Sequence, residues 1–409
     1  MQGDMAVGQR GAKKASAPDS TTVSGNPICR TEETREGGGG KAARLFPLDG
    51  FRGLIMVLMA LDHANHFIAQ QHSPGEYWGG GLPGYEDVFT FLSRFLTHLC
   101  APGFFFLMGI GMVLFASSRR KRGWGDGAVV GHFVVRGGLL MALQFLIVNR
   151  AWELSPGGWR PDIYVGVLFA LGGGMMLSGG ALPWLGPGPL LGLTIVLLIG
   201  TELLTPVPGM WNRSFPLLQR LLLVPGGDAR LWVNYPVLPW LELVTFGMAF
   251  GHWLADDAGK TFERASKLGV ALIVTFFVLR TLDGFGNIRP RAGNTWVDFL
   301  NVVKYPPSIS FSLLTMGANL IILGSMARVD GRLQPLLQPL ALFGRVPLFF
   351  YLVHLFVYAG LGLWLTPGET SILRMYPYWL LGLAILYPAC HWYGRLKRCQ
   401  SANPILRLV

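Results

Sequence analysis

Residues 47–111 decide the fold of this chain; they read PLDGFRGLIMVLMALDHANHFIAQQHSPGEYWGGGLPGYEDVFTFLSRFLTHLCAPGFFFLMGIG. The stretch holds two mostly apolar runs, and each is long enough for a helix that crosses a bilayer, which takes roughly 20 residues. Ionisable side chains are costly in hydrocarbon, so they face a protein interior or a water-filled cavity. We therefore place the candidate site among the ionisable residues of this stretch, which include Asp49, Arg52, Asp62, His63, His66, Arg94 and His98.

The rest of the chain has the composition of an integral membrane protein. Of its 409 residues, 51% are hydrophobic and only 14% are charged, whereas soluble domains carry about 25% charged residues. Apolar windows recur almost to the C-terminus without the alternation of strands. The predicted fold class is an all-α polytopic bundle of about ten transmembrane helices rather than a barrel. The expected spans are approximately 47–69, 89–117, 128–148, 163–180, 184–204, 236–255, 267–284, 308–326, 340–364 and 378–394.

Charge placement predicts the topology. Residues 1–43 are rich in Gly, Ser, Thr and charge, which is typical of a disordered tail. The loop at 118–127 is basic, and the loop at 70–88 carries acidic residues without Lys or Arg. Because cytoplasmic loops are enriched in Lys and Arg, both termini should be cytoplasmic. We predict one transmembrane domain at 44–398 between the tail and a short C-terminal tail at 399–409.

The formal net charge of +11 does not indicate a nucleic-acid partner, because the basic residues are scattered among loops. The expected surroundings are a lipid bilayer.

The four cysteines are far apart and show neither a CxxC motif nor the spacing of metal ligands. We predict no disulfide and no metal.

Helical spacing brings the ionisable residues of the first two spans together. Asp49 and His63 are 14 residues apart, or about 21 Å along a helix. Asp62 points away from His63 and is better placed to orient His66, one turn later. In the second span Arg94 and His98 share a face, and Pro102 predicts a kink just below His98.

This convergence predicts proton-transfer chemistry, because an imidazole has an unperturbed pKa near ~6.5. We expect His63 or His98 to act as the general base and Arg94 to stabilise an oxyanion. A two-step route through a covalent histidine intermediate stays open. So does the alternative that each residue only hydrogen-bonds between helices.

Further arginines lie near the expected cytoplasmic ends of the spans. Arg136 and Arg345 are candidates to line a mouth for an anionic ligand, with Arg119 and Arg120 at its rim and Arg52 at the inner end of the first span. The alternative is that the Arg119–Arg122 run is an ordinary cytoplasmic loop.

Five blocks of the chain resemble bacterial membrane proteins related to heparan-alpha-glucosaminide N-acetyltransferase. They are RLFPLDGFRGLIMVLMALDH at 44–63, FLSRFLTHLCAPGFFFLMGIG at 91–111, YPVLPWLELVTFGMAFG at 235–251, KYPPSISFSLLTMGANL at 304–320 and GRVPLFFYLVHLF at 344–356. The resemblance implies a membrane acyltransferase that takes acetyl-CoA from the cytosolic side and acetylates an amino sugar at the opposite face. The cytoplasmic (inner) membrane of a bacterium is the expected location.

The resemblance also bears on the site. His63 stands where the family has an asparagine after its LMxxx run, and His98 replaces an aspartate. His72 is the nearest match to the family's catalytic histidine in the following loop. The expected partners are acyl-CoA and a glycan or amino-sugar acceptor. A proton-coupled transporter or flippase of a polar lipid or sugar remains the alternative function, and a homodimer is compatible with the sequence.

Overall fold

The computed structural model describes residues 45–71, 76–80, 83–85, 87–156, 161–365 and 370–400. The predicted N-terminal tail, most of the C-terminal tail and His72 lie outside these residues. Helices dominate the described part of the chain. They are α1 (Phe46–Ala64), α2 (Val88–Thr97), α3 (Cys100–Arg120), α4 (Asp126–Leu143), α5 (Asn149–Trp152), α6 (Val167–Ala181), α7 (Pro187–Leu204), α8 (Leu217–Leu222), α9 (Val237–Asp256), α10 (Ala258–Leu282), α11 (Trp296–Leu300), α12 (Ile309–Ala327), α13 (Gln334–Arg345), α14 (Pro347–Leu365) and α15 (Ile372–Cys399).

Shorter elements complete the fold. Two π-helical turns, η1 (Asn65–Ala69) and η2 (Gln144–Val148), continue α1 and α4, and η3 (Pro208–Met210) is a 3-10 turn. Three short strands form a sheet in the order β1 (Ile163–Val165), β3 (Leu231–Val233), β2 (Gly226–Gly227). The sequence did not predict this sheet, because strands of two or three residues are too short to show an alternating pattern.

The segments predicted to span the membrane coincide with helical structure except at the start of 163–180, where Ile163–Val165 form β1 and the helix begins at Val167. Six helical segments of the described chain are long and apolar enough to cross a bilayer: Val88–Arg120, Asp126–Trp152, Pro187–Leu204, Ala258–Leu282, Ile309–Ala327 and Pro347–Leu365. The largely helical fold and the integral membrane character therefore agree with the sequence. The number of ten crossings and the cytoplasmic position of both termini stay predictions.

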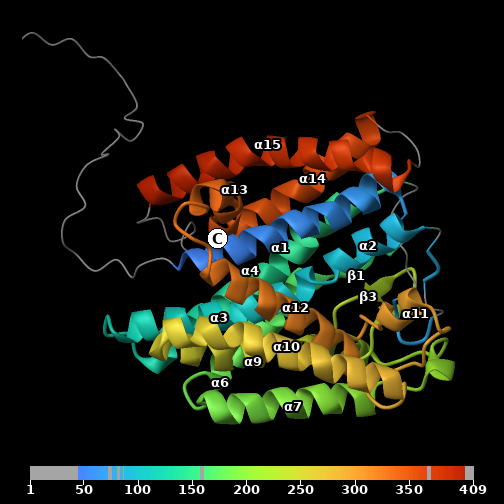
Figure 1. Cartoon of the computed structure of the whole chain (residues 1–409), viewed down its shortest axis with the longest axis horizontal. Helices are drawn as coiled ribbons and strands as arrows, with labels where there is room; N and C mark the ends of the chain where they lie inside the picture. Colours follow the sequence, from blue (N-terminus) through green and yellow to red (C-terminus); the bar gives the residue numbers. More distant parts are fainter. Residues whose placement is uncertain are drawn as a thin grey trace, which may run out of the picture. The chain divides into compact units, whose positions relative to one another are not determined.

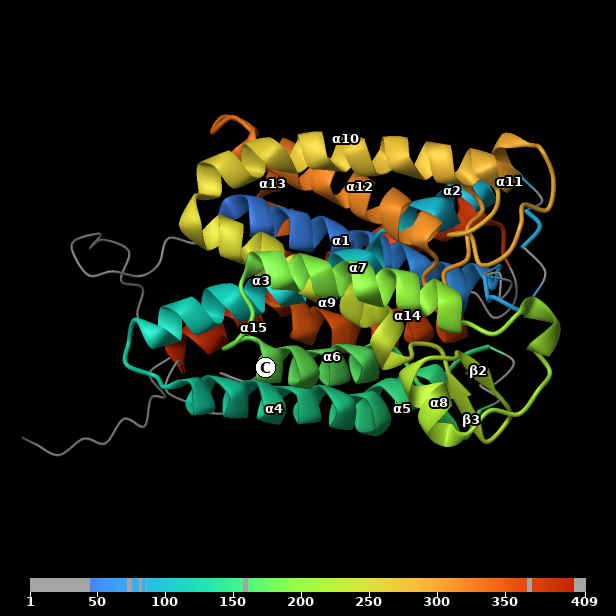
Figure 2. The same cartoon turned by 90° about the horizontal axis from the view of Figure 1, so that it is seen from below.

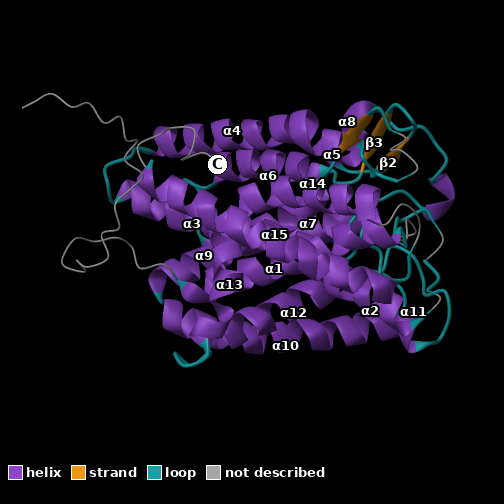
Figure 3. Cartoon of the chain, turned by 90° about the horizontal axis from the view of Figure 1, so that it is seen from above, coloured by secondary structure: helices purple, strands orange, loops and turns teal. Residues whose placement is uncertain are grey.

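The main helices run alongside one another, as Figure 1 shows. Figures 2 and 3 show β2, β3 and α8 gathered at one end of the helices. The C-terminal end of α1 points toward this same end in Figure 1. The outer helices expose large apolar side chains, for example Val196 on α7 and Val274 on α10, which are 66% and 57% exposed. Such apolar surface is what a lipid-facing helix presents.

Two prolines divide helices that the sequence predicted as continuous. The predicted span at 89–117 is α2 followed by α3, with the break at His98 and Leu99. Pro102 has no N–H to donate to the carbonyl of His98, so the kink predicted at this position is present. The predicted span at 340–364 was wrong as a single helix, because α13 ends at Arg345 and α14 begins at Pro347. The residue before a proline avoids the helical conformation, and Val346 accordingly has φ −129° and ψ 52°.

Glycines let the central helices approach closely. A Cβ added to Gly109 on α3 would collide with the backbone carbonyl of Val244 on α9, and one added to Gly247 on α9 would collide with the carbonyl of Phe106. Small residues at such crossings let helix backbones touch in membranes, where apolar side chains gain little by leaving lipid. The α3–α9 pair therefore depends on these two glycines.

We expect Gly109→Ala to destabilise the protein, because overpacking a close contact costs about 1–3 kcal/mol. The matched control is Gly111→Ala in the same helix, whose Cβ would enter open space. It should leave the melting temperature unchanged or slightly raised. Thermal unfolding of the detergent-purified protein, followed by tryptophan fluorescence, measures both; equal melting temperatures would contradict the close approach of α3 and α9.

Candidate active site

A buried ion network joins α1, α2 and the loop between them. Arg94 on α2 and Glu76 in the loop are 2% and 1% exposed. The Arg94 guanidinium donates to both carboxylate oxygens of Glu76, with Nε 2.6 Å from Oε1, and to the carboxylate of Asp62 on α1. The Thr97 hydroxyl also donates to Asp62, over 2.9 Å. Bidentate pairing of this kind satisfies a buried guanidinium and fixes its orientation.

Glu76 connects the network to a second segment of the chain. His98 Nε2 lies 2.7 Å from Glu76 Oε1. The backbone carbonyl of Glu76 accepts from the N–H groups of Lys304 and Tyr305, over 3.1 and 3.2 Å. Burial would raise the pKa of Glu76, but the neighbouring charges of Arg94, His98 and Lys304 together hold it well below its usual range. Glu76 is therefore ionised at neutral pH.

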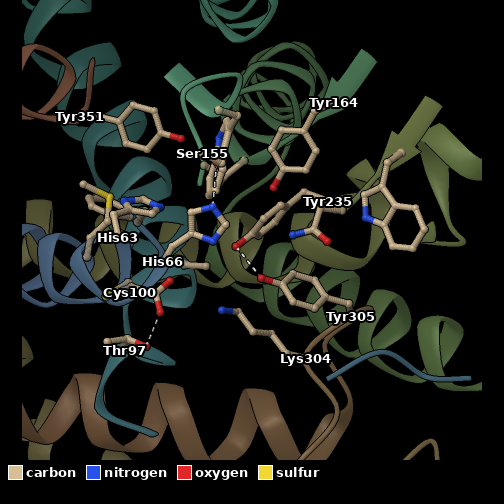
Figure 4. A pocket seen from close by; sticks show the side chains of 18 of the residues that line it. His63, His66, Thr97, Cys100, Ser155, Tyr164, Tyr235, Lys304, Tyr305 and Tyr351 are labelled. Atoms are coloured by element: carbon tan, nitrogen blue, oxygen red, sulfur yellow. Dashed lines mark hydrogen bonds between the residues drawn. The ribbon is translucent and has the colours of Figure 1, made fainter. Parts of the chain in front are cut away.

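A cavity of about 670 Å³ lies beside this network. Residues from many parts of the chain line it, and Figure 4 shows most of them. Among the described residues, its wall includes the predicted residues Asp62, His63 and His66 but not Arg94 or His98. The complete wall is Met59, Asp62, His63, His66, Tyr77, Thr97, Cys100, Ala101, Phe104, Trp152, Ser155, Pro156, Pro161, Tyr164, Val167, Trp232, Asn234, Tyr235, Lys304, Tyr305 and Tyr351.

His63 forms a histidine pair with His354 of α14. The distance from His63 Nδ1 to His354 Nε2 is 2.6 Å, and His354 Nδ1 lies 3.0 Å from the carbonyl oxygen of Phe350. A carbonyl only accepts, so Nδ1 of His354 carries a proton and its Nε2 is the acceptor when the ring is neutral. His63 then donates from Nδ1, and a neutral His63 has its lone pair on Nε2. The buried partner thus selects the tautomer of a histidine in the cavity wall.

His66 forms a second polar pair in the same wall. Its Nε2 lies 3.0 Å from the hydroxyl oxygen of Ser155. The edge of the Trp152 ring system packs against both imidazoles, with ring centroids 4.5 Å from His66 and 5.6 Å from His63. Asp62 lies one turn before His66, as the spacing predicted. Its carboxylate accepts hydrogen bonds from Arg94 and Thr97.

Lys304 brings a cation to the cavity. Its side chain is 3% exposed and points into the space near His66 and Thr97 in Figure 4. Within the described residues the ammonium of Lys304 has no hydrogen bond or ion pair, and it lies over the ring of Tyr305, 5.1 Å from the centroid. A buried ammonium without a paired anion is costly unless a ligand or water satisfies it. Lys304 is therefore the group of this wall best suited to meet negative charge.

Tyrosines surround the cavity on the side of the sheet. The hydroxyls of Tyr235 and Tyr305 are 3.2 Å apart, and the indole N–H of Trp232 donates to the Tyr77 hydroxyl over 3.2 Å. Burial raises the pKa of Tyr77 well above its usual range, so its hydroxyl keeps its proton at neutral pH. The wall thus combines flat apolar rings with hydroxyl groups.

The other predicted residues lie toward the opposite end of α1. Arg52 Nη1 is 3.3 Å from Asp49 Oδ1, and Arg345 Nε is 3.6 Å from Asp49 Oδ2. The charge of Arg136 is within electrostatic reach of Arg52. Within the described residues, Nε of Arg136 is buried without a hydrogen-bond partner. The structure thus places Arg52 and Arg345 on either side of the Asp49 carboxylate, with Arg136 near Arg52.

Arg119 and Arg120 are engaged at the turn between α3 and α4. The Arg119 guanidinium lies over the rings of Phe115 and Trp124, at 4.9 and 5.1 Å from their centroids. Arg120 pairs with Asp126 at 2.7 Å.

Among the described residues, no group of three or more His, Cys, Asp or Glu side chains is arranged to hold a metal ion.

Sequence reasoning did not assign four of these residues to the site. Glu76 and Lys304 lie in segments without helical periodicity, where spacing predicts no neighbours. Ser155 follows the short helix α5 and has no distinctive sequence context. His354 was visible as a histidine in an apolar helix, but nothing in the sequence connected it to His63.

We expect Glu76→Gln to lower stability by about 3–5 kcal/mol, because it leaves Arg94 buried with one fewer anion. The wild-type contribution is fully present above the unfolded pKa of glutamate, about 4.3, and is lost as the pH falls toward the lower folded pKa. The melting temperature of Glu76→Gln should therefore fall less between pH 5 and pH 3 than that of the wild type. Glu153→Gln is the control, since Glu153 is an exposed partner of Arg150. A Glu76→Gln melting temperature as high as that of the control would refute the structural role of the network.

Comparison with known proteins gives the family. A search of curated proteins finds no match. A sequence model described as the catalytic domain of heparan-alpha-glucosaminide N-acetyltransferase matches residues 44–283, more than half of the chain. The match covers the ion network and the part of the cavity that includes His63, His66 and Ser155. The chain therefore belongs to the family of the heparan-alpha-glucosaminide N-acetyltransferase catalytic domain.

Proposed function

We propose that this protein transfers an acetyl or other short acyl group from cytosolic acetyl-CoA to an amino sugar or other glycan acceptor at the outer face of the membrane. The proposal rests on the cavity, which is lined by the imidazoles of His63 and His66 and by Lys304. His63 is hydrogen-bonded to His354, and His66 is hydrogen-bonded to Ser155. Attack on a thioester needs a proton acceptor and a positive group near the developing oxyanion. This wall offers both.

His63 is the proposed general base for the acceptor. Its pair with His354 leaves the lone pair of the neutral ring on Nε2. An amine bound in the cavity loses its proton to this nitrogen as it attacks the acyl carbon. His354 stabilises the resulting imidazolium by accepting from Nδ1.

Lys304 takes the electrostatic role that the sequence argument gave to Arg94. The donors of Arg94 are directed at Glu76 and Asp62, so Arg94 and His98 hold Glu76 and Asp62 in place. The ammonium of Lys304 has no such anion among the described residues, and its backbone is fixed by Glu76. It is therefore the cation proposed to meet the oxyanion of the tetrahedral intermediate.

The aromatic wall suits a sugar acceptor. Small-molecule sites combine apolar rings with a few polar groups that set orientation. The rings of Trp152 and Trp232 offer flat apolar faces, and the hydroxyls of Tyr77, Tyr235 and Tyr305 can exchange hydrogen bonds with sugar hydroxyls.

The donor is proposed to be held from the opposite end of α1. Arg52, Arg136 and Arg345 would meet the phosphates of CoA, and the thioester would reach along α1 toward His63, which is 11 residues or about 16 Å beyond Arg52. Arg119 and Arg120, already engaged at the α3–α4 turn, would lie at the rim.

We expect His63→Ala to lower the rate of acetyl transfer by about 10²–10⁴-fold, the usual contribution of general base catalysis. Lys304→Met should lower it by about 10²–10³-fold, as for loss of an oxyanion donor. Transfer from labelled acetyl-CoA to glucosamine, measured with protein reconstituted in vesicles, gives both rates. The controls are His391→Ala and Lys260→Met, which alter exposed residues. Wild-type rates in both His63→Ala and Lys304→Met would overturn the assignment.

We also expect acetyl-CoA to raise the melting temperature of the detergent-purified protein, because a ligand that binds only the folded state stabilises it. Arg136→Gln should reduce this shift, and Arg119→Gln should reduce it less, because the Arg119 guanidinium already lies over two rings. Absence of any shift in the wild type at millimolar acetyl-CoA would favour the transporter alternative, which needs no acyl donor.

A further inference from the structure

We infer that Ser155 is an acyl-carrying nucleophile activated by His66, so that the proposed transfer proceeds in two steps through an acyl-serine. This inference rests on the proposed function and identifies the route that the acyl group takes through the same cavity. It starts from the contact between the Ser155 hydroxyl and His66 Nε2, which are 3.0 Å apart in the cavity wall. A hydroxyl within hydrogen-bond distance of an imidazole is the arrangement that makes a serine nucleophilic.

Local structure holds this pair in place. Ser155 lies in the turn that follows α5, where its N–H donates to the carbonyl of Trp152 over 2.9 Å, and Pro156 restricts its backbone from the other side. His66 lies in the π-helical turn η1, with its ring packed at near right angles to Trp152 and Phe67. Such π-helical turns often occur at functional sites because they redirect side chains out of the regular helix.

The partner of Ser155 differs from those of several other hydroxyls among the described residues. The side chains of Thr205, Thr315 and Ser325 each donate to the backbone carbonyl one turn earlier, which satisfies the hydroxyl without a side-chain partner. The hydroxyl of Ser155 instead meets an imidazole that lines a cavity. Donation from Ser155 to Nε2 requires that His66 carries its proton on Nδ1 when neutral. Asp62 lies one turn earlier in the sequence and lines the same cavity.

In the first step Ser155 attacks the acyl carbon of the thioester. The bond from the acyl carbon to Oγ forms, the proton of the hydroxyl passes to His66 Nε2, and the carbon–sulfur bond breaks to release CoA as its thiolate. The ammonium of Lys304 meets the oxyanion of the intermediate.

In the second step the acceptor amine attacks the acyl-serine. The carbon–nitrogen bond forms and the carbon–Oγ bond breaks. His63 takes the amine proton, while His66 returns its proton to Ser155. His63 then releases its proton to solvent, so the sum is acetyl-CoA plus amine giving amide, CoA thiolate and one proton. The two imidazoles of the cavity thus have separate roles, one for each nucleophile.

The route makes a prediction that direct transfer does not. An acyl-serine forms without acceptor, so the wild type should exchange label between acetyl-CoA and free CoA in the absence of any amine. The readouts are this exchange and mass spectrometry of acid-quenched protein, in which an ester on Ser155 survives whereas an acyl-imidazole hydrolyses. Ser155→Ala should lose the exchange and lower transfer to glucosamine by more than 100-fold. Ser325→Ala, which removes a hydroxyl bonded only to its own helix, should keep both.

Ser155→Cys keeps a nucleophile of similar size and guards against misfolding of the alanine variant. It should carry the acyl group as a thioester that neutral hydroxylamine cleaves. Transfer by the wild type without exchange, or wild-type transfer by Ser155→Ala, would overturn the inference and leave the proposed function intact. Absence of both transfer and exchange in the wild type would refute the proposed function and the inference together.

Discussion

The neutralisation of Arg94 is the interaction on which the rest of the site depends. A guanidinium that is 2% exposed in a membrane protein must have anions around it, and Glu76 and Asp62 supply them from a loop and from α1. These contacts fix the second helix against the first and hold the intervening loop inward. Since the same loop residue binds the backbone of Lys304 and Tyr305, one buried cation also determines where a second cation lies. The cavity wall is thus built on charge pairing rather than on apolar packing alone.

The two ends of α1 differ in how their charges are satisfied. At one end Asp49 lies between Arg52 and Arg345, and these arginines outnumber the carboxylates around them. At the other end the carboxylates of Asp62 and Glu76 pair with Arg94, and the ammonium of Lys304 has no hydrogen-bonded anion among the described residues. An anionic donor with a long flexible arm suits the first environment, and a neutral polar acceptor suits the second. This difference separates the site proposed for the donor from the site proposed for the acceptor along α1.

Sequence periodicity predicted the parts of this site that lie within helices. Arg94 and His98 were expected on one face, and both contact Glu76; Pro102 was expected to disturb the second span, and the helix breaks at His98. The remainder depends on long-range packing that spacing cannot reveal. Glu76 and Lys304 lie in irregular segments. The other residues of the wall, such as Tyr77 and Tyr351, come from separate elements of the chain. Helix length was predicted better than helix continuity, because apolar composition does not show where a proline ends one helix and begins another.

The histidine pair and the ion network also differ in when they can form during synthesis. Arg94 is 18 residues from Glu76 and 32 from Asp62, so all three are available once the first two helices have entered the bilayer. His63 and His354 are separated by 291 residues. At ~5–20 residues per second, translation delivers the second histidine tens of seconds after the first. The early helices can therefore be inserted with their strongest charges already paired. His63, the proposed general base, acquires the partner that sets its tautomer only after α14 has been synthesised.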